Sequence, residues 1–188
     1  ERGYEFSEDL YVPGYFELTI KKGETIVFSA GVGEIKTAKL KKMFEAEKAS
    51  RTPRSDFYNC LFAAVRQFYN QKEDGYYLLA GYPWFKFRAR DEFIALPGAT
   101  LAIGEVGMFE KIMERGTQAV HDFIDGKPKS TKLKEVSTPD VLLWYIWAVQ
   151  QYAQFTSLQQ TAERYGNVLV KIIAFIRGQK HVNLFLHD

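Results

Sequence analysis

The sequence contains very few of the residues that build disulfide frameworks and metal centres. Cys60 is the single cysteine, so no internal disulfide can form, and this usage fits a reducing, cytoplasmic compartment. Because Cys60 falls on an apolar helical stripe, we expect a small core residue rather than a nucleophile. The three histidines, His121, His181 and His187, are too sparse and too unevenly spaced for a zinc site. We therefore expect no metal and no other cofactor.

Long apolar runs and an excess of charge of one sign are also missing. The richest apolar stretch, residues 141–149, is far shorter than the roughly 20 residues that a membrane-spanning helix needs. The 25 basic and 23 acidic side chains nearly balance, which argues against a broad nucleic-acid surface. A dinucleotide fingerprint is absent too, because Lys36 stands where its third glycine would follow residues 31–33. We expect neither nucleic acid nor a membrane as partner.

Aromatic side chains, in contrast, are abundant: they make up 15% of the 188 residues, and hydrophobic residues make up 46%. This content suffices for a sizeable core and excludes intrinsic disorder as the main state. Residues 1–33 are predicted to form strands, because 15–20 and 25–30 are β-prone runs around the glycine-containing loop 21–24. A lone hairpin is marginal in water, so these strands need other strands or a helix beside them.

Residues 34–54 carry a net positive charge, with seven basic and three acidic side chains. Leu40, Met43 and Phe44 fall at helical spacing, so we predict a polar helix that joins two parts of the chain. Such a basic helix could instead touch an anionic surface. The solvated connector is the favoured interpretation, since runs of charge usually form solvated faces.

From Ser55 onward the hydrophobic pattern is that of helices. Apolar side chains recur at helical spacing in three stretches, 57–68, 109–124 and 162–176. Residues 137–140, Ser-Thr-Pro-Asp, are predicted to begin a further helix, and Ser157 with Gln160 resembles a capping box. Residues 141–149 are apolar on every side, which predicts a fully buried inner helix. The simplest arrangement is helical hairpins in two layers.

The helical pattern stops between residues 70 and 104. Residues 76–91 place aromatic side chains beside fixed charges, and Gly81 and Pro83 exclude a helix interior, so these aromatics are predicted to lie on a loop. A short helix is then predicted at 92–98, stopped by its Pro-Gly pair. Aromatic rings stack on the C–H face of a sugar while Arg and Asp hold its hydroxyls, so the segment suits a sugar site. The alternative is a structural plug with an internal Arg–Asp pair.

Part of this segment resembles the signature of the glycogen-debranching enzyme family, in particular the bacterial amylo-α-1,6-glucosidase catalytic domain. The stretches that carry the resemblance are Ala-Gly-Tyr-Pro-Trp-Phe at 80–85, Arg90-Asp91, and Phe-Ile-Ala-Leu-Pro-Gly at 93–98. Residues 137–146 are similar to that family's second inner-helix motif. The predicted strands within residues 10–30, with residues 9–13 and 22–24, resemble the end of its N-terminal β-sandwich.

The resemblance implies a mainly α fold: a partial (α/α)6 toroid of helical hairpins, preceded by a few β-strands from an N-terminal β-sandwich. It divides the chain into the end of the β-domain at 1–33, a linker helix at 34–54, and the first half of the catalytic domain at 55–188. Six hairpins of roughly 40 residues would need about 240 residues, so the last part supplies about three. We therefore expect a fragment that is inactive alone, exposes apolar faces and could self-associate.

The same resemblance implies a glycoside hydrolase that removes α-1,6-linked glucose from glycogen or branched α-glucan oligosaccharides. Arg90 and Asp91 would hold hydroxyls of the terminal glucose, with Tyr82 and Trp84 nearby. Asp140 could line the pocket from the next inner helix, or it could simply place a charge at a helix N-terminus. Such hydrolysis uses two carboxylates. The family's Trp-Met-Asp-type acid motif does not occur in the sequence, so we assign no catalytic residue.

Four positions depart from the family pattern. Lys86, Arg88 and Ala89 stand where glycine and a Trp-Gly pair are common, and Glu92 stands where threonine is usual. An aromatic platform is exchanged for a cation, which points to a subfamily or to an altered linkage preference. The alternatives are another glucoamylase-like or trehalase-like glycosidase, and a non-catalytic carbohydrate-binding or helical interaction module.

Overall fold

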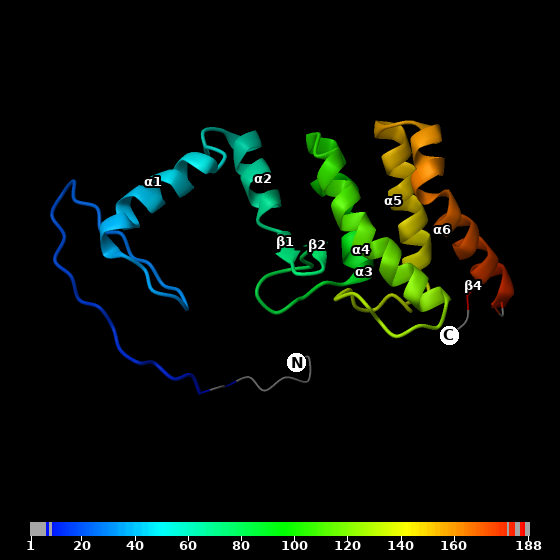
Figure 1. The fold of residues 1–188 in the computed structure, drawn as a ribbon, viewed down its shortest axis with the longest axis horizontal. Coiled ribbons are helices and arrows are strands. Elements are labelled where there is room, and N and C mark those ends of the chain that lie inside the picture. Colours follow the sequence, from blue (N-terminus) through cyan, green and yellow to red (C-terminus); the bar gives the residue numbers. More distant parts are fainter. Residues whose placement is uncertain (1–6, 8, 180, 183–184, 187–188) are drawn as a thin grey trace. The chain divides into compact units, whose positions relative to one another are not determined.

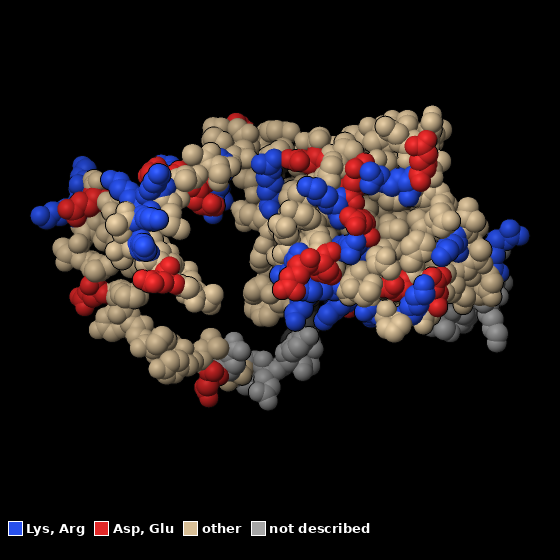
Figure 2. Space-filling view, viewed as in Figure 1, with Lys and Arg blue, Asp and Glu red and all other residues tan. Residues whose placement is uncertain are grey.

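The computed structural model describes residues 7, 9–179, 181–182 and 185–186 (Figure 1). The chain divides into two compact units, Glu1–Arg51 and Thr52–Asp188. Figure 2 shows that basic and acidic side chains intermingle over the visible face of the second unit. This face therefore carries no broad patch of one sign, in keeping with the near balance of charge along the chain.

In the first unit, the predicted loop forms but the predicted strands do not. The Glu24 amide donates to the Lys21 carbonyl at 3.0 Å, and the Lys21 amide donates to the Glu24 carboxylate at 2.9 Å, which closes a turn. Residue 7 and residues 9–36 contain no strand, although the Phe16 and Phe28 rings lie 5.8 Å apart. Both rings are exposed, because no sheet or helix within the described part of this unit covers them. The strand prediction was wrong for these residues, since a pair of segments without apolar cover is not stable as a sheet.

A helix is present within the range 34–54, as its spacing predicts. The short 3-10 helix η1 (Thr37–Lys39) leads into α1 (Leu40–Ser50), and α1 buries none of its residues. Its Glu47 carboxylate pairs with Arg51 at 2.8 Å, and both side chains stay largely exposed. The solvated character of this helix is confirmed, while its role as a linker between domains stays a prediction.

The second unit begins with a helix that is more exposed than expected. Helix α2 (Phe57–Arg66) starts where the Asp56 carboxylate accepts a 2.8 Å hydrogen bond from the Asn59 amide. None of its residues is buried, and Phe57 and Leu61 are 78% and 50% exposed. Cys60 is exposed as well, so the prediction that it is a core residue was wrong. An apolar stripe predicts which face of a helix can be buried, but a neighbour must be present to bury it.

A β-hairpin follows where the sequence indicated only an interruption of the helical pattern. Strand β1 (Tyr69–Lys72) pairs antiparallel with β2 (Gly75–Leu78), and Tyr69 lies opposite Leu78. Strand β2 packs against α3 and α4, which buries Tyr77 and Leu78. The hairpin therefore joins the helical core mainly through β2, and the Tyr69 hydroxyl of β1 adds a hydrogen bond to the Ala99 carbonyl of α3.

Four helices and a 3-10 turn form the rest of the core, and Figure 1 shows α3, α4, α5 and α6 in this part of the chain. They are α3 (Ala89–Ala99), η2 (Leu101–Ile103), α4 (Val106–Ile124), α5 (Val141–Phe155) and α6 (Leu158–Gly178). Helix α5 contacts α3, α4 and α6. The predicted stripe on α4 is confirmed at Phe109, Ile112, Met113, Gly116 and Val120, all of which are buried. Burial of each large apolar side chain contributes about 1.5–3 kcal/mol.

Helix α3 is longer than the predicted 92–98. It begins at Ala89 and contains Pro97, so Arg90 and Asp91 lie in its first turn and not on the preceding loop. A proline in the last turn costs one backbone hydrogen bond and does not end the helix at once. The loop prediction therefore holds only for residues 79–88, because residues 76–78 belong to β2.

Helix α5 differs from its prediction in two ways. It is not buried on all sides, because Leu143 is 52% exposed, while Tyr145 and Ala148 are fully buried. It also begins without a hydroxyl cap, since the Thr138 hydroxyl donates backward to the Glu135 carbonyl at 3.0 Å. Asp140 stands at the N-cap position, with its carboxylate engaged elsewhere.

Helices α5 and α6 form a helical hairpin with a tight connection. The Ser157 hydroxyl accepts a 3.1 Å hydrogen bond from the Gln160 amide, which confirms the predicted cap of α6. The short strands β3 (His181–Val182) and β4 (Phe185–Leu186) pair after α6. Within the described part of the chain, no helix is both long and apolar enough to cross a membrane. The mainly α fold is confirmed, while a toroid of six hairpins remains what the resemblance implies.

Candidate functional site

The loop between β2 and α3, residues 79–88, is a tight, well-anchored turn. The Ala80 amide donates to the Lys86 carbonyl at 3.0 Å, and Gly81 forms a bridge with Phe85. A side chain at Gly81 would bring its Cβ within 3.2 Å of the Phe85 ring, so glycine allows this close approach. The Tyr82–Pro83 peptide bond within the turn is cis.

The two predicted aromatic residues of this loop have different environments. The Tyr82 hydroxyl donates to the Gln67 carbonyl, and its ring lies 5.6 Å from the Phe68 ring. Tyr82 therefore anchors the loop to the end of α2, although 57% of it stays exposed. Trp84 is 82% exposed and offers its ring to solvent. The exposed indole has the character of a stacking platform, whereas much of Tyr82 is engaged structurally.

Two side chains, Arg90 of α3 and Trp144 of α5, meet at Asp140, the N-cap residue of α5. The Arg90 Nε lies 3.0 Å from Asp140 Oδ2, and Trp144 Nε1 donates to the same oxygen at 3.0 Å. Asp140 Oδ1 is buried and accepts no hydrogen bond from any described residue. The indole of Trp144 also packs edge-on against Trp147, with centroids 5.6 Å apart. The cluster thus combines a cation, aromatic rings and a carboxylate oxygen with unused acceptor capacity.

Asp91 does not belong to this cluster. It is exposed and lines a separate hollow of about 450 Å³, whose other lining residues are mainly apolar and include Phe68 and Ile94. Successive residues of a helix diverge by about 100°, so Arg90 and Asp91 face different neighbours. The structure brings Arg90 and Asp140 together and leaves Asp91 apart, so the predicted alternative of an internal Arg90–Asp91 pair was wrong.

The carboxyl group of Glu92 is buried. In the sequence, Glu92 stood out only because threonine is usual at this position of the family, and nothing there predicted its burial. Its Oε2 accepts a 2.9 Å hydrogen bond from the Leu78 amide, and its Oε1 is buried without a partner among the described residues. Burial raises the pKa of Glu92 to about 8, against the lesser opposing effect of the Leu78 amide. The neutral carboxyl therefore links β2 to α3 inside the core and is not open to a substrate.

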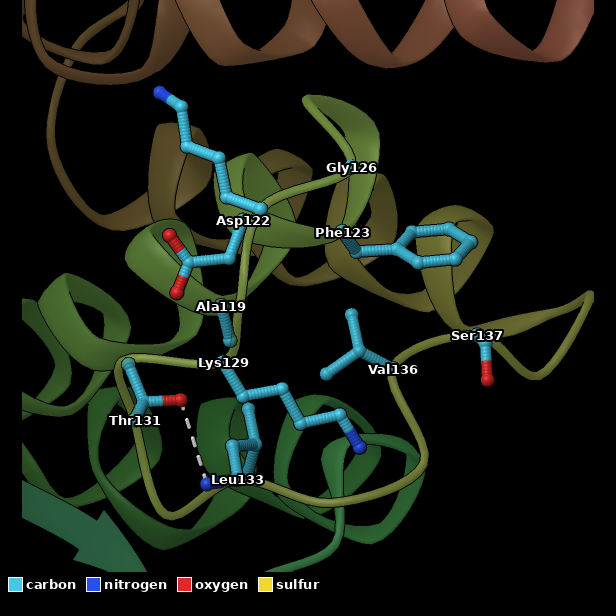
Figure 3. Close-up of a pocket in the computed structure, with 10 residues that line it drawn as sticks. Ala119, Asp122, Phe123, Gly126, Lys129, Thr131, Leu133, Val136 and Ser137 are labelled. Atoms are coloured by element: carbon cyan, nitrogen blue, oxygen red, sulfur yellow. Dashed lines mark hydrogen bonds between the residues drawn. The ribbon is translucent and has the colours of Figure 1, made fainter.

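The loop between α4 and α5 is fixed by Asp122. Its Oδ2 accepts from the Ser130 amide at 2.9 Å and from the Ser130 hydroxyl at 2.6 Å, and its Oδ1 accepts from Gln118 at 2.8 Å. Burial opposes ionisation, but these hydrogen bonds outweigh it and lower the pKa of Asp122. Ala119 and Phe123 of α4, together with Leu133 and Val136 of the following loop, line a hollow of about 240 Å³ (Figure 3).

The loops before α3 and before α5 meet backbone to backbone. The Lys134 amide donates to the Phe87 carbonyl at 2.9 Å, and the Ala89 amide donates to the Lys134 carbonyl at 3.0 Å. Arg88 pairs with Glu135 at 3.1 Å beside this contact. A third hollow, of about 910 Å³, lies between these loops and the β-hairpin.

Metal binding has no support in the described residues. No group of three or more His, Cys, Asp and Glu side chains lies close enough there to hold an ion. His121 approaches Lys171, with 3.5 Å between Nδ1 and Nζ. The side chain of His181 and all of His187 lie outside the described part of the chain.

These features describe the class of protein as a helical domain whose adjoining loops carry aromatic, acidic and cationic side chains. A family model described as amylo-alpha-1,6-glucosidase matches residues 60–186, which is more than half of the chain. The chain belongs to this family of glycogen-debranching glycoside hydrolases. No curated protein and no solved structure matches it.

Proposed function

We propose that the chain supplies the glucose-binding residues of an α-1,6-glucosidase that acts at branch points of glycogen or related α-glucans. The observation that carries the proposal is the cluster of Arg90, Asp140 and Trp144, which lies within the matched range 60–186. Cations, carboxylates and indole rings in contact are the groups that bind sugars through charge-assisted hydrogen bonds and stacking.

Arg90 is the group of this cluster that a glucose hydroxyl can reach most readily, because its side chain is 57% exposed whereas Asp140 Oδ1 is buried. Arg90 holds the other oxygen of the same carboxylate at 3.0 Å, so a neighbouring hydroxyl could accept from the remaining guanidinium hydrogens. The exposed ring of Trp84 would stack on an adjoining sugar unit. Asp91 would act from its separate hollow, on a glucose unit other than the one at Asp140.

Hydrolysis itself needs an acid for the leaving oxygen and a base for water, and an inverting pair is roughly 6.5–9.5 Å apart. Glu92 is buried and neutral, and Asp140 is engaged by Arg90, so neither is assigned to the pair. We therefore expect these 188 residues alone to bind a branched glucan without releasing glucose from it. Release of glucose from a limit dextrin by this chain would contradict that assignment.

The binding site is tested by replacing Asp140 with asparagine, which keeps its shape and removes its charge. We expect the Asp140→Asn chain to bind a branched limit dextrin about ten-fold more weakly, since a hydrogen bond to a charged group is worth about 1.5–3 kcal/mol. Isothermal titration calorimetry gives the dissociation constants, and Glu163→Gln on the exposed face of α6 is the matched control.

The outcomes separate the candidate functions. Loss of dextrin binding in Asp140→Asn with no change in Glu163→Gln supports the proposal, provided that both variants melt at the wild-type temperature. Equal binding by all three chains would refute it. Tighter binding of trehalose than of the branched dextrin would instead indicate a trehalase-like preference.

A further inference from the structure

The 910 Å³ hollow between the loops 79–88 and 126–136 is rich in lysine. Five of its described lining residues are lysines and one is a carboxylate: Lys72, Lys86, Lys129, Lys132, Lys134 and Glu135. None of the five lysines forms an ion pair with a residue that the structure describes. Glu135 is already compensated by Arg88 at 3.1 Å. Lys72 lies over the Phe87 ring, 5.8 Å from its centroid, but positive charge without an anionic partner still gathers in one concave place.

The backbone holds these lysines in position. The Lys132 amide donates to the Tyr77 hydroxyl at 3.0 Å, and Lys134 is bonded on both sides to the segment 87–89. Asp122 fixes the start of the same loop through Ser130. Like charges on a flexible loop could move apart, but here their attachment points cannot separate without breaking these hydrogen bonds. An anion in the hollow would reduce the repulsion between these lysines.

The remaining lining groups suit a sugar. Phe85 is 39% exposed, and Asn70, Thr131 and Ser137 contribute an amide and two hydroxyls. The volume lies within the range of about 300–1,000 Å³ that is typical of small-molecule sites. Because the loop of Trp84 forms one wall of the hollow, a glucan held at that loop would extend toward the lysines.

We propose that this hollow binds a phosphate monoester carried on an α-glucan chain. This inference rests on the proposed function, and it adds the chemical class of substrate: a phosphorylated branched or linear oligoglucoside. The lysines recognise the dianionic phosphate, and the polar and aromatic groups recognise the attached glucose unit. A nucleic acid is the weaker occupant, because the cations line a single hollow and do not form a stripe along the surface.

The test compares four probes on the full 188-residue chain: maltotriose 6-phosphate, maltotriose, inorganic phosphate and a uridine oligonucleotide. Dissociation constants are measured by calorimetry at 20 mM and 200 mM salt. We expect the phosphorylated sugar to bind at least ten-fold more tightly than either maltotriose or phosphate, and its affinity to fall as salt rises.

Two variants assign the effect to the hollow. The double change Lys132→Gln with Lys134→Gln should weaken phosphorylated-sugar binding at least ten-fold and change maltotriose binding less than two-fold. Arginine at both positions should restore the binding, since it keeps the charge. The matched control is Lys41→Gln with Lys42→Gln on the solvated helix α1. The backbone bonds of Lys132 and Lys134 do not involve their side chains, so folding should be retained, which thermal melting checks.

Each other outcome overturns the proposal. Equal dissociation constants for maltotriose 6-phosphate and maltotriose would mean that the hollow does not bind the phosphate group. Equal binding of inorganic phosphate and the phosphorylated sugar would mean an anion site without sugar recognition. Tighter binding of the oligonucleotide, lost in the lysine variant, would mean a nucleic-acid groove. Failure of the proposed function is distinct, because it appears as unchanged dextrin binding in Asp140→Asn.

Discussion

The buried carboxyl of Glu92 makes the stability of this protein depend on pH in an unusual direction. Its pKa is about 8 in the folded chain, and the ordinary value is 4.5. Below pH 4.5 the group is protonated in both states and has no effect on the pH dependence. Between pH 4.5 and 8 the unfolded chain releases its proton and the folded chain keeps it, so stability falls as pH rises. Above pH 8 the loss is complete.

The magnitude follows from the interval between the two pKa values. Each pH unit is worth 1.36 kcal/mol, so the interval of about 3.5 gives a total loss of about 5 kcal/mol, of which about 3 kcal/mol is present at pH 7. This is a large share of the roughly 5–15 kcal/mol by which proteins of this size are stable. The Glu92→Gln variant removes the titration and keeps an oxygen for the Leu78 amide. Its added amide hydrogens stay unpaired at the position of Oε1, which costs about 1–3 kcal/mol at every pH.

The assay is urea unfolding at pH 5, 6, 7 and 8, followed by tryptophan fluorescence. We expect the free energy of unfolding of the wild-type chain to fall by several kcal/mol relative to Glu92→Gln between pH 5 and 8. At pH 5 the variant should be the less stable chain, and by pH 8 the order should reverse. The exposed Glu114→Gln change is the control and should follow the wild type. Parallel profiles of wild type and Glu92→Gln would refute the reasoning, because the carboxyl would then ionise normally.

Two further perturbations probe the packing beside the loops. Gly116→Ala should destabilise the chain by about 1–3 kcal/mol, because the alanine Cβ would lie 2.6 Å from the Phe93 ring. Thermal melting measures the effect, and a melting temperature equal to that of the wild type would contradict this close approach. Asp122→Ala should cost about 2–3 kcal/mol and speed tryptic cleavage of the loop 126–136, since the donors of Ser130 and Gln118 lose their acceptor. Unchanged cleavage would mean that Asp122 does not hold the loop.

Local signals predicted a good part of this structure. The stripe on α4 and the cap at Ser157 were correct because they depend on residues within a few turns of each other. The loop after β2 was predicted from Gly81 and Pro83, whose backbone restrictions apply in any context. The family was identified from a linear motif for the same reason, and the family match over 60–186 confirms it.

The wrong predictions concern segments whose structure depends on a neighbouring strand or helix. The runs at 15–20 and 25–30 have the composition of strands, but strands need neighbours, and the described part of their unit provides none. Cys60 lies on the apolar stripe of α2, a helix that buries none of its residues fully. The hairpin of β1 and β2 was missed because its stability comes from the burial of Tyr77 and Leu78 against distant helices.

Composition and charge determined the class of protein but not the arrangement of its charged groups. The scarcity of cysteine and histidine, the balance of charge and the abundance of aromatics set the class of protein, since composition fixes which chemistry is available. Only the tertiary structure decided which charged groups meet, because such contacts depend on the packing of helices and loops. It brought Arg90 to Asp140 and left Asp91 apart. It also gathered five lysines from three segments around one hollow within a chain whose net charge is only +2.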